Sequence, residues 1–263
     1  MNAMLSKSLQ DQRRPFVGWG IGVAAMAIMY TAFYPSIRSS AGVLTRYIQN
    51  MPEAFRNLIG GDFISPAGYL RSEVFTILGP ILFLIFAVSA GARAIAGEEE
   101  AGTLDLLLST PVRRRRVLVD KTLAIGVALI GLGVVLWLAI VLVGPAFQLH
   151  VALTSVASGV CMLVLLGTAF GAVALAVGTA TGHKGLADAA AGGFALVTYI
   201  VNAVAPQVSA LRSLRPLCPF RWYFDPDPIK TGLHAANLAV LVGIIAVGVT
   251  VALFTFERRD LAA

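Results

Sequence analysis

Residues 74–96 read VFTILGPILFLIFAVSAGARAIA, an apolar stretch with a single charged residue near its end. Its length is close to the roughly 20 residues that carry an α-helix across the hydrocarbon core of a bilayer. Apolar and polar residues do not alternate along it, which argues against a strand of a membrane barrel. Because lipid offers the backbone no hydrogen bonds, a spanning segment of this kind must be helical. The stretch therefore predicts a transmembrane helix.

Five further stretches have the same character, and the whole composition agrees with them. Of the 263 residues, 57% are hydrophobic and 13% are charged, whereas a soluble domain usually carries roughly 25% charged residues. No internal repeat at a solenoid period is present. We predict an all-α, polytopic integral membrane protein that forms one domain over residues 1–263. Its six spans are expected at residues 16–34, 74–96, 122–144, 153–180, 189–205 and 238–256.

The net charge of +6 is explained by basic residues that flank the spans. An even number of spans places both chain ends on one side. The tight basic clusters on that side include Arg13–Arg14, Arg113–Arg116 and Arg258–Arg259. Under the positive-inside rule, both termini are then cytoplasmic, in a plasma membrane. No basic stripe interleaves with stacking aromatic residues, so nucleic-acid binding is not expected.

The same topology divides the connecting segments. Residues 1–14 are expected as a cytoplasmic segment in the membrane interface, restarting at Pro15. Residues 36–73 and 207–237 become outer loops, the first with a short amphipathic helix over residues 43–51. The second loop is rich in proline and aromatic residues, which predicts a broken, partly re-entrant segment or an ordinary interfacial loop. Its candidates for an outer vestibule are Pro219, Phe220, Trp222 and Tyr223.

The block at 97–121 is predicted to be a cytoplasmic loop with a surface for a partner. Its acidic residues, Glu98–Glu100, suit the first turn of a helix. Leu104, Leu107 and Leu108 follow at spacings that share one helical face, and Pro111 ends the helix. Exposed apolar surface of this kind usually marks an interaction site. The alternative is a solvated loop that only sets the topology.

Catalytic chemistry is not predicted for this chain. The middles of the spans hold no ionisable residue, which argues against a proton-coupled transporter. Residues 178–185, GTATGHKG, depart from a phosphate-binding loop because a glycine follows the lysine and a membrane helix precedes it. An intramembrane hydrolase remains as an alternative, but the three histidines lie in or beside loops and suggest no metal site. The two cysteines, Cys161 and Cys218, are expected to be free.

Three segments resemble the membrane subunits of type-two ATP-binding-cassette (ABC) exporters. That family carries a pattern close to G-E-[ED]-x-x-G-T-L-[ED]-x-L-L-[ST]-x-P-[VI] between its second and third spans. The chain matches it at Gly97, Glu98, Glu99, Gly102, Thr103, Leu104, Asp105, Leu107, Leu108, Ser109, Pro111 and Val112. The segments 217–220 with 225–226, and 256–261, also look like those of the family.

The resemblance implies a permease subunit for ATP-driven export of a hydrophobic or amphiphilic substrate, such as a drug, a peptide or a lipid-like molecule. It implies a second permease subunit, identical or different, within membrane lipid, and a separate ATPase subunit that holds ATP and Mg²⁺. The chain itself would then be no enzyme and hold no cofactor or metal. A non-transporting membrane anchor or sensor is the other reading. The coupling helix that docks on the ATPase would involve Glu98, Glu99, Glu100, Gly102, Thr103, Leu104, Asp105, Leu107, Leu108 and Pro111.

Overall fold

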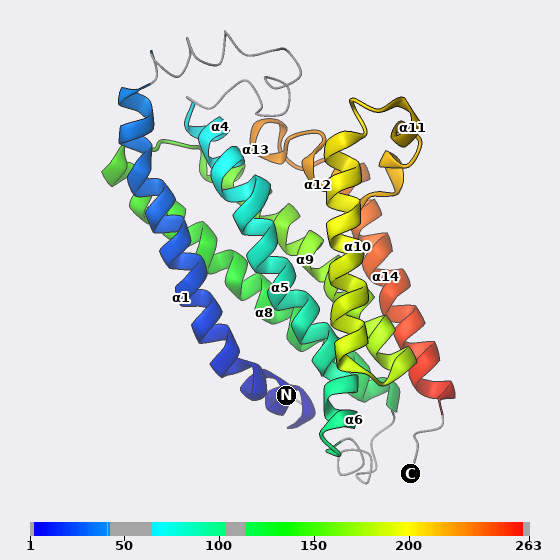
Figure 1. Ribbon diagram of the computed structural model, residues 1–263. Helices are drawn as coiled ribbons and strands as arrows, with labels where there is room; N and C mark the ends of the chain where they lie inside the picture. Colours follow the sequence, from blue (N-terminus) through cyan, green and yellow to red (C-terminus); the bar gives the residue numbers. More distant parts are fainter. Residues whose placement is uncertain (1–2, 41, 43–64, 104–113, 260–263) are drawn as a thin grey trace.

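The computed structural model describes residues 3–40, 42, 65–103 and 114–259, with the backbone alone for residues 3–11. Every regular element in these ranges is helical. Six of the helical runs are long and apolar enough to cross a membrane (Figure 1). The prediction of an all-α, polytopic membrane protein is confirmed.

The spans follow one another along the chain with short elements between the last two. The first is α1 (Ala3–Ser39), and the second joins α4 (Pro66–Leu70), η1 (Arg71–Leu78), α5 (Gly79–Ala92), η2 (Arg93–Gly97) and α6 (Glu98–Glu100). Both η1 and η2 are π-helical. The third is α8 (Arg114–Val143) with the 3₁₀ turn η3 (Gly144–Phe147), and the others are α9 (Leu153–Thr181), α10 (Lys184–Val204) and α14 (Ala235–Arg258).

Several predicted boundaries are wrong. The predicted outer loops are helical at residues 36–39, 66–73 and 235–237. The chain does not restart at Pro15, because α1 runs through this residue without ending. The second span continues to Glu100 as one helical run, so within the predicted loop 97–121 the two ends, 97–100 and 114–121, are helical. The fifth span begins at Lys184 rather than at residue 189. The predicted helix at residues 43–51 lies outside the described residues.

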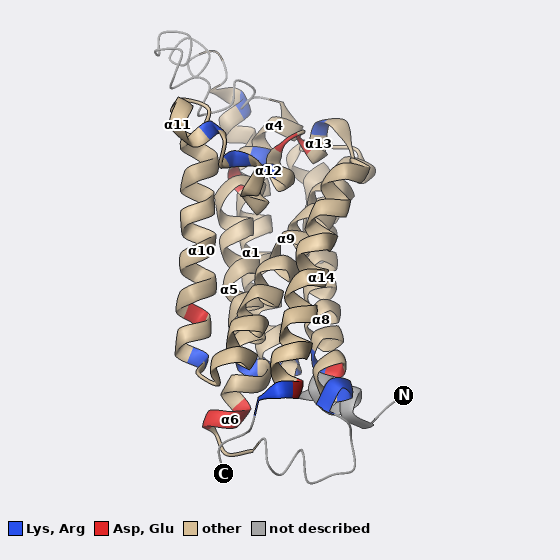
Figure 2. Cartoon of the chain, turned by 90° about the vertical axis from the view of Figure 1, so that its right-hand side faces the viewer, with Lys and Arg blue, Asp and Glu red and all other residues tan. Residues whose placement is uncertain are grey.

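The six spans form a bundle with α9 at its centre (Figure 1). α9 packs against α5, α8, α10 and α14, whereas α1 packs mainly against α8. We call the end that carries α6, the start of α1 and the end of α14 the α6 end, and the opposite end the α12 end. Lys, Arg, Asp and Glu gather at these two ends, and the long middles of the helices carry other residues (Figure 2).

Close helix contacts depend on glycines that face neighbouring backbones. A Cβ at Gly91 of α5 would lie 2.2 Å from the carbonyl oxygen of Gly171 in α9. A Cβ at Gly171 would in turn lie 3.1 Å from the oxygen of Ala87. Gly167 and Gly178 also face neighbouring helices, at 3.4 and 3.5 Å. Because lipid is as apolar as the core, such close packing is what holds membrane helices together.

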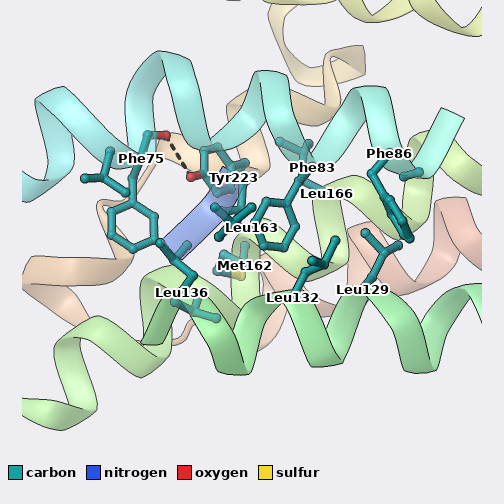
Figure 3. Packing of buried hydrophobic residues seen from close by; sticks show 14 of the residues in the cluster. Phe75, Phe83, Phe86, Leu129, Leu132, Leu136, Met162, Leu163, Leu166 and Tyr223 are labelled. Carbon is teal, nitrogen blue, oxygen red and sulfur yellow. Dashed lines mark hydrogen bonds between the residues drawn. The ribbon is translucent and has the colours of Figure 1, made fainter. Parts of the chain in front are cut away.

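Large side chains fill the space between α5, α8 and α9 (Figure 3). Phe83 of α5 is fully buried, as are Leu129 and Leu132 of α8 and Leu163 and Leu166 of α9. These residues belong to one continuous cluster. It fixes the position of α5, the helix that leads into the acidic turn described below.

The segment before the last span is broken, as predicted. It contains α11 (Ser209–Arg212), the 3₁₀ turn η4 (Arg215–Leu217), α12 (Pro219–Phe224) and α13 (Pro228–Thr231). Prolines stand in the first turns of η4, α12 and α13, where their missing N–H costs nothing. The same prolines prevent the segment from forming one long helix.

Candidate functional site

The acidic residues Glu98–Glu100, which we call the glutamate turn, end a helix instead of beginning one. They form the last turn of the helical run Pro66–Glu100, so the prediction that they begin a helix is wrong. Negative charge at a helix C-terminus opposes the macrodipole at a cost of about 0.3–1 kcal/mol per residue. Cationic or N–H partners must therefore offset three carboxylates at this position.

A glycine closes the glutamate turn. Gly102 has φ +66°, and its N–H donates to the carbonyl oxygen of Glu99 at 3.0 Å. The N–H of Thr103 donates to the oxygen of Glu98 at 2.9 Å, and its hydroxyl donates to the same oxygen at 3.2 Å. This pair of backbone bonds is a Schellman motif, which needs a residue in the left-handed region and so favours glycine. The Gly-Thr pair thus has a structural role: it ends the second span.

Glu98 pairs with α8. The ammonium group of Lys121 donates to Glu98 Oε1, and the side chains are only 9% and 24% exposed, respectively. Glu98 Oε2 is buried and has no hydrogen-bond partner among the described residues. The pair ties the glutamate turn to the first turns of the third span.

Glu99 pairs with the end of the last span through two parallel hydrogen bonds. Arg259 Nη1 donates to Oε2 at 3.0 Å and Nη2 donates to Oε1 at 2.7 Å. Arg259 Nη1 also donates to the carbonyl oxygen of Thr179 at 3.4 Å, and the Arg259 carbonyl accepts from Arg114 Nη1 at 3.0 Å. The guanidinium covers Gly182, where a Cβ would lie 2.2 Å from Nη2. Arg259 therefore joins the ends of α6, α8, α9 and α14.

Glu100 meets the start of the fifth span. Its Oε1 accepts from the backbone N–H of Lys184 at 2.8 Å, and His183 Nδ1 lies 4.0 Å from the same oxygen. The first N–H groups of a helix lack partners within the helix and attract negative charge. Each of the three consecutive glutamates is thus hydrogen-bonded to a different helix. Residues 104–113, the rest of the predicted docking segment, follow directly after Thr103.

Only some of the predicted docking residues lie within the described ranges. Glu98, Glu99, Glu100, Gly102 and Thr103 are described, and each makes hydrogen bonds within the chain. Leu104, Asp105, Leu107, Leu108 and Pro111 lie outside the described residues. Sequence reasoning missed Lys121, Lys184 and Arg259 as partners of the glutamates.

A cavity of about 570 Å³ lies between α5 and α10. Its walls are mainly aliphatic, from the Ile77–Val88 stretch on one side and Ala195 and Leu196 on the other. Ser89 and Asp188 line it towards the α6 end, and Tyr199 and Phe220 line it towards the α12 end. Asp188 Oδ2 accepts from Lys184 Nζ at 2.7 Å. A space of this size and lining can hold a mostly apolar molecule with one polar group.

An aromatic cluster borders the cavity at the α12 end. Phe220 of α12 contacts Tyr199 of α10 and Phe170 of α9, with ring centroids 5.2 and 5.6 Å apart. Phe170 also contacts Phe194, 5.7 Å away, and Tyr199 contacts Phe224 at 6.4 Å. Such ring pairs contribute about 0.5–1.5 kcal/mol each beyond their area. The cluster joins α9, α10 and α12.

Of the four predicted vestibule residues, three are buried. Pro219, Phe220 and Tyr223 are inside, and Trp222 is half-buried with its indole N–H donating to Pro216 O at 2.8 Å. The Tyr223 hydroxyl donates to the carbonyl oxygen of Phe75 in η1 at 2.8 Å (Figure 3). Complete burial raises the pKa of this hydroxyl well above its ordinary value, so it stays a donor. Only Phe220 lines the large cavity.

Two other features of the described ranges concern chemistry. No group of three or more His, Cys, Asp or Glu residues there could hold a metal ion. Cys161 and Cys218 are free thiols, as predicted. Burial raises the pKa of the Cys218 thiol, although the neighbouring Arg215 lowers it.

The described residues form six apolar spans with a cavity between α5 and α10. At the α6 end, the glutamate turn bonds to three other helices. These features are those of a multi-pass membrane protein of the transporter class. A comparison with protein families matches residues 3–261 to the ABC-2 family transporter proteins. The chain belongs to this family and is a membrane subunit of an ABC transporter. The family resemblance found in the sequence is thereby confirmed, and membership of this family implies association with an ABC ATPase subunit. No curated protein matches the chain.

Proposed function

We propose that this permease exports a hydrophobic or amphiphilic substrate and that its pathway includes the cavity between α5 and α10. The cavity carries the proposal, because its walls are aliphatic while Ser89 and Asp188 offer polar partners at one end. An apolar cargo could leave the bilayer for these walls at little cost, since both surroundings are apolar. Drugs, peptides and lipid-like molecules all fit this description.

We place the α6 end in the cytoplasm of a cell whose plasma membrane holds the protein. The support is the basic cluster at that end, which includes Arg13, Arg14, Arg115 and Arg116 (Figure 2). Basic residues close to span ends favour the cytoplasmic side. The aromatic cluster then closes the pathway on the outer side, and export requires α12 to separate from α10.

Residues 104–111 dock on the ATPase subunit in this proposal, and the glutamate turn holds them in place. The leucines at 104, 107 and 108 supply the apolar contact. The glutamates transmit movement, because each is fixed to another span: Glu98 to α8, Glu99 to the end of α14, and Glu100 to α10. ATP and Mg²⁺ reside on the partner subunit.

A second permease subunit pairs with the face formed by α1, α5 and α10. A Cβ at Gly18 or Gly22 of α1, or at Gly192 or Gly193 of α10, would meet nothing within 4 Å. Small outward-facing residues let another helix approach closely. Large exposed aliphatic residues suited to lipid predominate on the outward face of α8: Leu123, Val127, Ile130, Val134, Leu138 and Leu142.

The test fills the cavity and follows transport. Ile81→Trp places a large side chain in the cavity wall, and we expect ATP-dependent movement of fluorescent amphiphilic dyes into inverted vesicles to fall about tenfold or more. Leu138→Trp on α8 is the matched control, because the parent residues are 44% and 40% exposed. Equal transport by both variants would contradict the pathway. ATP hydrolysis by the complex without transport of any dye would favour the anchor or sensor instead.

A further inference from the structure

A second cavity, of about 190 Å³, lies between α1, the α5–η2–α6 run and α8 at the α6 end. One part of its wall is polar, from Gln12, Arg93, Glu98 and Lys121. At about 30 Å³ per water molecule in the liquid, its volume suits a group of several heavy atoms, such as a phosphate with its ester carbons. The proposed pathway does not use this cavity.

The rest of the wall is apolar and adjoins an aromatic pair. Pro15, Phe86 and Ala90 line this part, and the ring of Trp19 meets that of Phe86 edge-on, with centroids 6.2 Å apart. The cavity therefore combines a polar part and an apolar part at the level where a phospholipid changes from headgroup to acyl chain.

Arg93 supplies the positive charge of the cavity. Its side chain is exposed and makes one hydrogen bond among the described residues, from Nε to the carbonyl oxygen of Ser89 at 3.3 Å. Lys121 and Glu98 form an ion pair, so their charges cancel. A guanidinium presents a planar fork that matches a phosphate through two parallel hydrogen bonds.

Two acceptors beside Arg93 select the rest of the headgroup. Glu98 Oε2 and Gln12 Oε1 are both buried without a hydrogen-bond partner among the described residues. A buried acceptor without a partner is unfavourable, and an ammonium group, with three N–H donors, satisfies both after small side-chain rotations. A choline group has no N–H and cannot do so.

From these features we propose that the cavity binds one phosphatidylethanolamine molecule of the leaflet at the α6 end. Its phosphate meets Arg93, its ammonium meets Glu98 and Gln12, and an acyl chain lies along Phe86 towards Trp19. Because α1 contacts α5 only sparsely, this lipid connects the first span to the second. Binding requires neither the ATPase subunit nor transport, so it can be tested separately from the proposed function.

The test compares lipid adducts of the delipidated full-length chain by native mass spectrometry. Phosphatidylethanolamine and phosphatidylcholine with identical acyl chains are supplied at equal concentration. We expect the ethanolamine lipid to bind at least about fivefold better, the order of effect of one satisfied acceptor. Arg93→Gln should lower its binding about tenfold, whereas Arg116→Gln, an exposed arginine at the same end, should leave it unchanged.

A second variant and two competitors complete the design. Gln12→Leu keeps the ion pair of Glu98 intact and should reduce the preference for ethanolamine over choline while phosphate binding persists. Equal binding of both lipids by the parent, or equal losses in the Arg93 and Arg116 variants, would overturn the proposal. Displacement of the lipid by millimolar inorganic phosphate would show a free-anion site instead, and stronger binding of phosphatidylglycerol would show an anionic-lipid site. Helix content by circular dichroism confirms that each variant is folded.

Discussion

The ion pair between Glu99 and Arg259 allows two possible roles of the glutamate turn to be distinguished. If Glu99 acts inside the chain, its charge matters only together with that of Arg259, which lies 160 residues later. If it acts on the ATPase subunit, Arg259 is irrelevant to it. Glu99→Arg breaks the bond in the first case, and adding Arg259→Glu restores it with the charges exchanged.

The size of the effect follows from the geometry. The two side chains are 22% and 26% exposed and share two parallel hydrogen bonds. A hydrogen bond to a charged group contributes about 1.5–3 kcal/mol, and solvent reduces exposed pairs to below about 1 kcal/mol. For this degree of exposure we expect a coupling energy of about 2 kcal/mol, or about 30-fold in an equilibrium constant.

A double-mutant cycle with Glu99→Gln and Arg259→Gln measures this coupling. Unfolding of the purified chain is followed by circular dichroism in mixed micelles with increasing sodium dodecyl sulfate. In the reconstituted complex, Glu99→Arg should reduce ATP-driven transport, and the exchanged pair should recover most of it. A coupling energy below about 0.5 kcal/mol, together with no recovery in the exchanged pair, would refute an intramolecular role and assign Glu99 to the partner contact.

Three further predictions concern the docking segment, the topology and the turn after α9. Leu107→Asp should leave the abundance of the protein in the membrane unchanged but abolish co-purification of the ATPase subunit, since one buried anchor can contribute about 2 kcal/mol; retained binding would contradict docking there. In a background without native cysteines, a cysteine at Ser209 should react with an impermeant thiol reagent in intact cells and one at Thr181 should not; the reverse result would invert the orientation. Gly182→Ala should lower the unfolding free energy by about 1 kcal/mol or more, because φ is +72° and Arg259 occupies the space of a Cβ, whereas Gly185→Ala, with open space around it, should not.

Much of the fold could be predicted because a lipid bilayer permits few backbone structures. The apolar runs gave the number of spans, and the prolines before the last span gave its broken approach. The helix at Pro15 was mispredicted because proline weakens a helix on average by about 3 kcal/mol, while the residues around it can still favour continuation. The glutamates were misplaced for a similar reason: three acids usually begin a helix, and here distant cations allow them to end one.

The site was less predictable because its partners are remote in sequence. Lys121 is 23 residues from Glu98, and Lys184 is 84 residues from Glu100. No local pattern gives such pairings. The cavity between α5 and α10 depends on which faces of the two helices meet, and their apolar sequences are too uniform to indicate this. Gly102 carried a local signal that the prediction did not use: a glycine directly after a helix marks its end, whereas Gly102 was assigned to the docking helix.

The second span is one helical run that is longer than the bilayer is thick. Its 35 residues correspond to a rod of about 52 Å, longer than the roughly 40–45 Å of a whole bilayer with its headgroups. A tilt of about 5° around one end would displace the other by about 4.5 Å, on the scale of a helical turn. The π-helical segments near both ends are the places where such a rod can bend. A small tilt of the second span about its α12 end would therefore displace the glutamates by several ångströms.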